Sequence, residues 1–281
     1  MLATKTKISL AAAAQRVVSL ARAATGKDHI AEVERRKIRW RLDLREGIDF
    51  SIYLLGAFEP STANTLDKLA KPGDVALDIG ANIGAHTLGL ARSVGPNGRV
   101  FAFEPADFAF EKLRCNLALN PQLEERVTTR QILLDKSNDT PRKEQIYASW
   151  PLGTEEPLHP KHRGRLVSTK NARVDTLDGF WEREGLERLE LIKMDVDGNE
   201  LPVLQGGLKT LTKFRPTMVM EMVPYVHAEH SNSFSALVEL LAQIGYSLQH
   251  ADTWELLPLD AHKLEAMIPD GAGINVIARA S

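Results

Sequence analysis

From residue 74 onward the sequence alternates between short apolar runs and longer amphipathic segments. The runs have the length and composition of strands buried on both faces of a sheet. The segments between them place apolar residues at helical spacing. We expect strands at 74–80, 99–105, 126–135, 189–195, 216–222, 247–251, 254–259 and 274–280, and helices at 86–94, 107–119, 199–211 and 234–245. This alternation predicts an α/β fold with a mostly parallel sheet covered on both faces.

The heptapeptide DIGANIG, residues 78–84, joins the first expected strand to the first expected helix. In open sheets of this kind, ligands bind beyond the carboxyl ends of the strands. Asp78 begins the loop, and Gly80 and Gly84 permit tight backbone turns. The third glycine of a nicotinamide fingerprint is missing, and no Gly-Lys-Ser/Thr follows as in a P-loop. The sequence therefore disfavours both of these phosphate-binding loops.

Glu104 stands at the end of the second expected strand. A carboxylate there can accept hydrogen bonds from both hydroxyls of a ribose. Because no phosphate pattern accompanies it, we expect a nucleoside with a zwitterionic substituent, and S-adenosylmethionine fits that description. Asp78, Gly80 and the following helix N-terminus offer acceptors for its ammonium and amides for its carboxylate. The alternative is that the glycines form only a turn and that Glu104 only ends a strand.

Seven stretches together resemble one known family: WRLDLREGIDFSIYLLGAFEP (40–60), KPGDVALDIGANIGAHTL (71–88), GRVFAFEP (98–105), NLALN (116–120), VDTLD (174–178), LIKMDVDGNELPVLQGG (191–207) and RPTMVMEM (215–222). They resemble the FkbM family of S-adenosylmethionine-dependent methyltransferases. The resemblance implies a class I methyltransferase, Rossmann-like fold: a mostly parallel seven-stranded sheet with helices on both faces. It covers residues 40–281 as a methyltransferase domain and leaves 1–39 as an N-terminal helical extension.

Two single residues, Asp197 and Asn82, stand out when the chain is compared with the family it resembles and with other methyltransferases. The family usually carries Glu where this chain has Asp197. Asn82 stands where other methyltransferase subgroups carry Gly, and we expect its side chain to brace the loop or the methionine moiety of the cofactor.

The resemblance also implies O-methylation of a hydroxyl, on a sugar, glycan or natural-product acceptor. Two other functions are compatible with the residues alone. One is a nucleotide-dependent oxidoreductase on a related sheet, and the other is a non-catalytic cofactor-binding protein.

Candidate catalytic residues follow the fourth and fifth expected strands. Asp195 comes after LELIKM and shares its face with Lys193, Glu221 lies near the end of PTMVMEM, and His227 follows in the next loop, with His230 three residues on. A carboxylate or histidine there could accept the proton of the acceptor hydroxyl. The alternatives are that the acids only cap a helix start and that the histidines lie on the surface.

Two further sites are less sharply indicated. Asp135 ends the third expected strand, where it could accept from the exocyclic amine of adenine or merely begin a turn. Asp195 and Glu221 could hold Mg²⁺, but their spacing does not require it, and we predict no metal. The proline-containing stretch 138–172 predicts a long insertion or lid, in which HPKHRGR (159–165) is either a solvated basic loop or a contact for an anionic acceptor.

The net charge of −2 predicts no general attraction to nucleic acid. A single cysteine, Cys115, fits a reducing cytoplasm. No run reaches the about 18 apolar residues of a membrane span. Residues 8–24 predict a basic amphipathic helix, which could dock on its own domain, on a second protomer of a homo-oligomer, or on a membrane surface. The break in the apolar run at Gln15 argues against a signal peptide.

Overall fold

The computed structural model describes residues 4–153, 158–229 and 233–280. Within them the main sheet has eight strands, in the order β13-β12-β14-β11-β10-β3-β4-β5. Their bounds are Leu256–Leu257 (β13), Tyr246–His250 (β12), Ile274–Ala280 (β14), Thr217–Met222 (β11), Leu191–Met194 (β10), Val75–Ile79 (β3), Arg99–Phe103 (β4) and Val127–Arg130 (β5).

The sheet is mostly parallel, as predicted. β5, β4, β3, β10 and β11 run parallel, and β14 runs antiparallel to both β11 and β12. The chain moves outward from β3 to β4 on one side and returns to β10 on the other, so the strand order reverses between β3 and β10. That reversal is where sheets of this class bind ligands. The predicted fold class is confirmed, with the two-residue β13 added at the edge.

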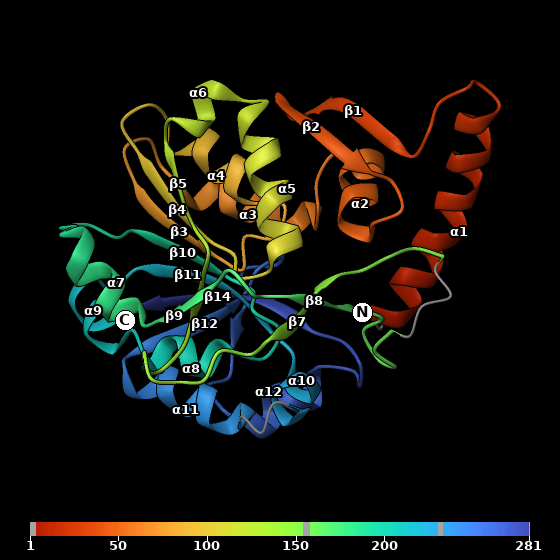
Figure 1. Ribbon diagram of the computed structural model, residues 1–281. Coiled ribbons are helices and arrows are strands. Elements are labelled where there is room, and N and C mark those ends of the chain that lie inside the picture. Colours follow the sequence, from red (N-terminus) through yellow and green to blue (C-terminus); the bar gives the residue numbers. More distant parts are fainter. Residues whose placement is uncertain (1–3, 154–157, 230–232, 281) are drawn as a thin grey trace.

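Two layers of helices cover the sheet (Figure 1). One face carries α3 (Pro60–Leu69), α4 (Thr87–Ser93), α5 (Asp107–Ala118) and the short α6 (Pro121–Glu124). The other carries α7 (Leu177–Glu184), α8 (Glu200–Gln205), α9 (Leu208–Phe214), α11 (Phe234–Gln243) and α12 (Ala261–Met267). Alternate residues of the central strands point to these two layers: Leu77 joins the core beneath α7–α12, and Ala76 joins the core beneath α3 and α4. Both faces are thus buried, as the continuous apolar runs predicted.

The strand expected at 126–135 is divided. β5 ends at Arg130, and Ile132–Leu134 forms β6, which pairs in parallel with β9 (Arg173–Asp175) outside the main sheet. Ile132 and Leu134 are buried in the core beneath α7 although β6 is not part of the main sheet. This burial explains why both residues are apolar.

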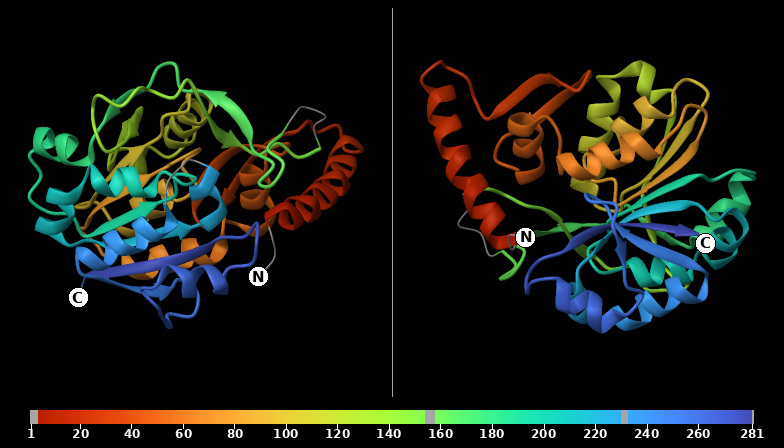
Figure 2. Two further views of the ribbon diagram at one scale, coloured as in Figure 1. Left: turned by 90° about the horizontal axis from the view of Figure 1, so that it is seen from below. Right: turned by 180° about the vertical axis from the view of Figure 1, so that it is seen from behind.

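The N-terminal segment packs on the domain as a helix and a hairpin. α1 (Thr4–Ala23) is followed by the antiparallel strands β1 (Ile30–Arg35) and β2 (Ile38–Asp43) and then by α2 (Gly47–Leu55). Both views in Figure 2 place α1 at the margin of the molecule. Residue 39, the expected end of the extension, lies within β2, and the division into two domains stays a prediction. None of the described helices is both long and apolar enough to span a bilayer.

The insertion expected at 138–172 contains a second hairpin, β7 (Gln145–Ser149) and β8 (Arg165–Ser168). Ala148 packs on Ala106 and Ala109 at the start of α5. The far end of the hairpin is held to the N-terminal segment, because Gly47 N donates to Trp150 O and the hydroxyl of Ser149 donates to Glu46. The hairpin therefore extends alongside the strand ends of the main sheet.

Candidate functional site

Four acidic residues expected at the site, together with Lys193, reach one edge of the sheet. Asp78 and Lys193 are neighbours across the β3–β10 pairing, and Glu104 directly follows β4. Asp195 directly follows β10, and Glu221 lies one residue before the end of β11. All of these strands are parallel, so their carboxyl ends meet at the same edge.

The loop 78–84 touches the segment after β10 through backbone atoms. Gly80 has φ +80°, and a Cβ at this position would lie 1.8 Å from the carbonyl oxygen of Asp195. Any side chain at Gly80 would therefore separate the two loops. Gly84 also has positive φ, +89°, but a Cβ there would meet side chains rather than backbone, Leu113 Cδ1 at 2.8 Å and Leu88 Cδ1 at 3.6 Å.

A buried lysine holds the beginning of the loop. Lys193 Nζ donates to the carbonyl of Gly80 at 2.8 Å and lies 3.3 Å from Asp78 Oδ1 and 3.9 Å from Asp195 Oδ2. The hydroxyl of Thr87 donates to the other oxygen of Asp78 at 2.6 Å. Burial disfavours the charge on Lys193, but Asp78 and Asp195 outweigh it and raise the pKa of the ammonium. Lys193 therefore already occupies two of the acceptors, Asp78 and Gly80 O, that the sequence suggested for the cofactor's ammonium.

Glu104 is buried and fixed by two backbone amides. Its Oε2 accepts from Asn82 N and its Oε1 from Ala106 N, each at 2.8 Å. Burial raises the pKa of Glu104 to about 7 in spite of these hydrogen bonds. The carboxyl group thus links the loop after β3 to the end of β4, and each of its oxygens retains a second lone pair for a ligand.

Asn82 connects the loop to the insertion. It has φ +48°, a conformation that Asn tolerates better than most residues. Its Nδ2 donates to Ala148 O of β7 at 3.2 Å, and its Oδ1 accepts from Ile83 N at 2.9 Å. The side chain thus ties the loop to β7.

We expect Asn82→Ala to lower the free energy of unfolding by about 2–4 kcal/mol, because it removes both hydrogen bonds and places Ala at positive φ. Asn82→Gly is the matched variant, since it removes the same bonds without the conformational penalty. It should be less destabilising than Asn82→Ala by about 1–2 kcal/mol. Urea denaturation of the three proteins measures both differences. Equal stability of the two variants would show that the backbone conformation at Asn82 costs nothing.

Carboxyl groups gather around Asp195. Burial, and after it the charge of Asp195, raises the pKa values of Glu59, Asp197 and Glu221. The Asp195 side chain is itself 27% exposed. Because an opposite charge favours the ionised form of a carboxyl group, a cationic ligand at this cluster would lower these raised pKa values.

Glu59 was not found by sequence reasoning. It immediately precedes α3, with φ +41°, and accepts hydrogen bonds from Thr62 and from Asn275 of β14, each at 3.0 Å. It comes to the strand ends from the N-terminal segment. The only signal for it in the sequence was its place in the stretch 40–60 that carries the family resemblance.

His227, expected in a loop, lies in α10 (Pro224–Glu229) and is fully buried rather than on the surface. Its Nε2 lies 3.2 Å from Glu200 Oε2. Glu200 Oε1 in turn accepts from the amides of Val196 and Gly198, and burial raises the pKa of Glu200 to about 7. Both residues thus lie behind the 195–198 loop and support it. His230 lies outside the described residues.

Asp135 follows β6, which belongs to the smaller parallel pair. Its Oδ1 accepts from Lys136 N at 2.6 Å and from the hydroxyl of Thr140 at 3.1 Å. These are the contacts of a residue that begins a turn, the alternative that the sequence left open. One carboxylate oxygen is engaged in them.

The basic segment of the insertion, residues 159–165, contacts α10. The rings of His159 and His162 stack at 3.7 Å, and His159 Nε2 lies 3.2 Å from Glu229. These two histidines and Glu229 have ligand atoms within 4.8 Å of one another, but the rings are within 7° of parallel, so their lone pairs do not converge on one ion. Lys161 lies over the ring of Tyr225 at 4.8 Å. The segment is thus packed against α10 rather than freely solvated.

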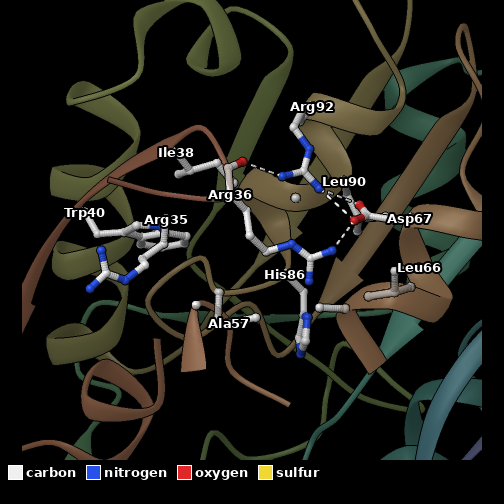
Figure 3. Close-up of a pocket in the computed structure, with 14 residues that line it drawn as sticks. Arg35, Arg36, Ile38, Trp40, Ala57, Leu66, Asp67, His86, Leu90 and Arg92 are labelled. Atoms are coloured by element: carbon white, nitrogen blue, oxygen red, sulfur yellow. Dashed lines mark hydrogen bonds and ion pairs between the residues drawn. The ribbon is translucent and has the colours of Figure 1, made fainter. Parts of the chain in front are cut away.

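A separate pocket lies between the β1–β2 hairpin, α3 and α4 (Figure 3). Arg36 and Arg92 both bind the carboxylate of Asp67 there, at 2.6 and 2.7 Å. His86 lies at its base, and burial lowers the pKa of this histidine to about 3, so the ring is neutral at physiological pH. The arginines already share a carboxylate, and the pocket does not include the residues at the strand ends.

Comparison with known proteins gives relatives by sequence and neighbours among solved structures. The family described as the methyltransferase FkbM domain matches residues 78–248. The 2-O-methyltransferase NoeI of Sinorhizobium fredii is 30% identical over 153 residues, which cover 52% of this chain and 63% of that protein. The methyltransferase sdnD of Sordaria araneosa is 32% identical over 154 residues, covering 46% and 59%. The match thus spans less than two thirds of either relative.

Among solved structures, the methyltransferase FkbM of Methylobacillus flagellatus is 16% identical, with a TM-score of 0.43 over 77% of this chain and 50% of that one.

Proposed function

The chain belongs to the FkbM methyltransferase domain family, and from this premise we propose that it transfers a methyl group from S-adenosylmethionine to a hydroxyl oxygen of a sugar, glycan or natural-product acceptor. The observation that carries the proposal is the backbone contact between Gly80 and Asp195, with Glu104 fixed beside it. The loop 78–84 and Glu104 therefore lie together at the strand ends. The loop would bind the methionine end of the cofactor, and Glu104 would bind the ribose.

The residues present fit this cofactor chemically. Its ammonium and sulfonium are cations, and Asp195 lies close enough to Glu59 and Glu221 for its charge to raise the pKa of each, after the larger effect of their burial. Lys193 already binds Gly80 O and Asp78, which leaves the partly exposed Asp195 as the carboxylate available to the ammonium. Glu104 supplies the acceptor for the ribose diol, and Asp135 remains our proposal for the adenine amine.

When bound, S-adenosylmethionine would supply a methyl carbon for in-line transfer to the acceptor oxygen, with its sulfur leaving as the neutral thioether of S-adenosylhomocysteine. The protein's part is to orient the acceptor, exclude water and take the hydroxyl proton. Asp195 and Glu221 are the proposed proton acceptors. His227 is proposed instead as a positioning residue, because it binds Glu200, which holds the amides of the 195–198 loop. The hydroxyl acceptor is supported by the name of the 2-O-methyltransferase relative.

We expect cofactor affinity to rise with pH through about 7, the pKa of buried Glu104. Ribose hydroxyls donate more strongly to the ionised carboxylate than to the protonated acid, so binding lowers this pKa, and a group whose pKa falls on binding gives tighter binding at higher pH. Below pH 7 the affinity should fall by up to about tenfold per pH unit and should level off above pH 8. Isothermal titration calorimetry from pH 5.5 to 8.5 measures the profile, and buffers of different ionisation enthalpy report the released proton.

Glu104→Gln should flatten this profile and weaken binding at pH 8 by about 1.5–3 kcal/mol, since a charged hydrogen-bond partner is lost. The matched control is Glu111→Gln, at an exposed glutamate on α5. It should leave the pH profile and the cofactor affinity at pH 8 unchanged. A pH profile that survives in Glu104→Gln would remove Glu104 from the ribose site.

Transfer itself is tested by incubating the chain with cofactor carrying a labelled methyl group and a panel of sugars, glycans and polyhydroxylated natural products. Label in an alkali-stable ether on one acceptor class supports the proposal. Binding of the cofactor without transfer to any class that carries a free hydroxyl would favour a non-catalytic cofactor-binding protein.

A further inference from the structure

The outer side of α1 is apolar and uncovered. The exposed residues Leu10, Ala13, Val17, Leu20 and Ala21 follow one another at helical spacing, and we call them the outer stripe. Leu10, Val17 and Leu20 are 60%, 68% and 74% exposed. At 100° per residue the stripe spans about 100° of the helix surface, which is the width of a face that ordinarily packs against something.

The opposite side of the same helix is already used. Ile8, Ala11 and Val18 pack against the cluster formed by the β1–β2 hairpin and α2. Arg22 fixes the end of the helix by donating to the carbonyls of Asp28 and Ile30. The stripe is therefore held outward by packing on the inner side, and α1 cannot bury it by rotating.

Cations border the stripe on both sides. Lys7 and Arg16 are exposed on either flank, and Lys27 is exposed just beyond the helix. The sequence has no acidic residue before Asp28, although the whole chain carries a net charge of −2. A helix with an apolar face and cations along its polar boundary has the pattern of one that lies in the interface of a bilayer.

We propose that α1 docks the protein on an anionic lipid surface, with the outer stripe inserted among the acyl chains and the flanking cations at the headgroups. Charge complementarity favours an anionic lipid surface over a second copy of the chain, because a second copy would bring an equally cationic helix against α1. The inference does not depend on methyl transfer.

Docking through α1 would also bring the strand-end site near the surface. Burial and Asp195 raise the pKa of Glu59, and Lys7 opposes them, which puts the beginning of α1 within electrostatic reach of Glu59. Figure 1 shows the N-terminal end of α1 on the side of the molecule where β7 and β8 lie.

The test is co-sedimentation of the full chain with vesicles of phosphatidylcholine alone and of phosphatidylcholine with 30% phosphatidylglycerol. We expect binding to the anionic vesicles, at least tenfold weaker binding to the neutral ones, and loss of binding as salt rises from 50 to 500 mM. Leu10→Gln/Val17→Gln/Leu20→Gln keeps good helix formers on the helix and should reduce partitioning at least tenfold. Lys7→Glu/Arg16→Glu should do the same while retaining the apolar stripe.

Leu256→Gln/Leu259→Gln removes exposed leucines elsewhere and is the matched control, expected to bind as wild type. Circular dichroism and thermal unfolding check that each variant is folded. Equal binding of the stripe variant and wild type would overturn the proposal, as would failure of wild type to bind anionic vesicles. Light scattering tests whether a second copy of the chain binds the outer stripe. A dimer of the wild type that is lost in the stripe variant, with no binding to vesicles, would identify a second copy instead.

Discussion

Asp195→Asn is expected to lower turnover at saturating substrates by about 10²–10⁴-fold, the usual contribution of a general base. Asp195 follows β10 directly, contacts the cofactor loop through its carbonyl at Gly80, and presents a partly exposed carboxylate. The substitution keeps the size of the side chain and removes its charge. Transfer of a labelled methyl group under single-turnover conditions measures the chemical step.

Cofactor affinity in the same variant separates two roles. If Asp195 mainly accepts the hydroxyl proton, calorimetric affinity stays within about threefold of wild type while turnover falls. If it mainly binds the ammonium, affinity falls together with turnover. Asp139→Asn, at an exposed aspartate in the turn after β6, is the control for loss of one carboxylate. Wild-type turnover and wild-type affinity in Asp195→Asn would transfer the catalytic assignment to Glu221.

Gly80→Ala is expected to weaken cofactor binding by about 100-fold or more and to destabilise the fold by about 2–5 kcal/mol. Two physical effects add at this position. An L-residue at φ +80° costs about 1–2 kcal/mol, and a Cβ 1.8 Å from Asp195 O forces two backbone segments apart at a further cost of about 1–3 kcal/mol. The displaced segments are those that the proposal assigns to the methionine end of the cofactor.

Gly84→Ala is the matched control, because it carries the same penalty of positive φ. Its Cβ would meet the flexible end of Leu113 rather than backbone, so the loop should keep its path. We expect it to lose stability by about 1–2 kcal/mol and to retain affinity within about threefold. Chemical denaturation and calorimetry on both variants give the comparison. Near-wild-type binding by Gly80→Ala would show that the contact with Asp195 does not shape the cofactor site.

The sequence by itself determined the class of fold and the edge of the sheet that carries the candidate site. Apolar runs alternating with amphipathic segments specify buried parallel strands with helices between them, and such strands end on one side. That is sufficient to place Asp78, Glu104 and Asp195 at a common edge. The glycines of DIGANIG predicted a tight loop there, because only glycine adopts its backbone conformations without strain.

The tertiary structure alone decided which of these groups touch and which are free. Lys193 takes the acceptors at Asp78 and Gly80, Glu59 arrives from a segment far away in the sequence, and His227 is buried against Glu200. The outer stripe of α1 is uncovered because the other side of the helix packs on the β1–β2 hairpin and α2. A periodic pattern specifies how one segment buries its own apolar face. The meeting of polar groups from different segments depends on strand order and packing distance, which no single segment encodes.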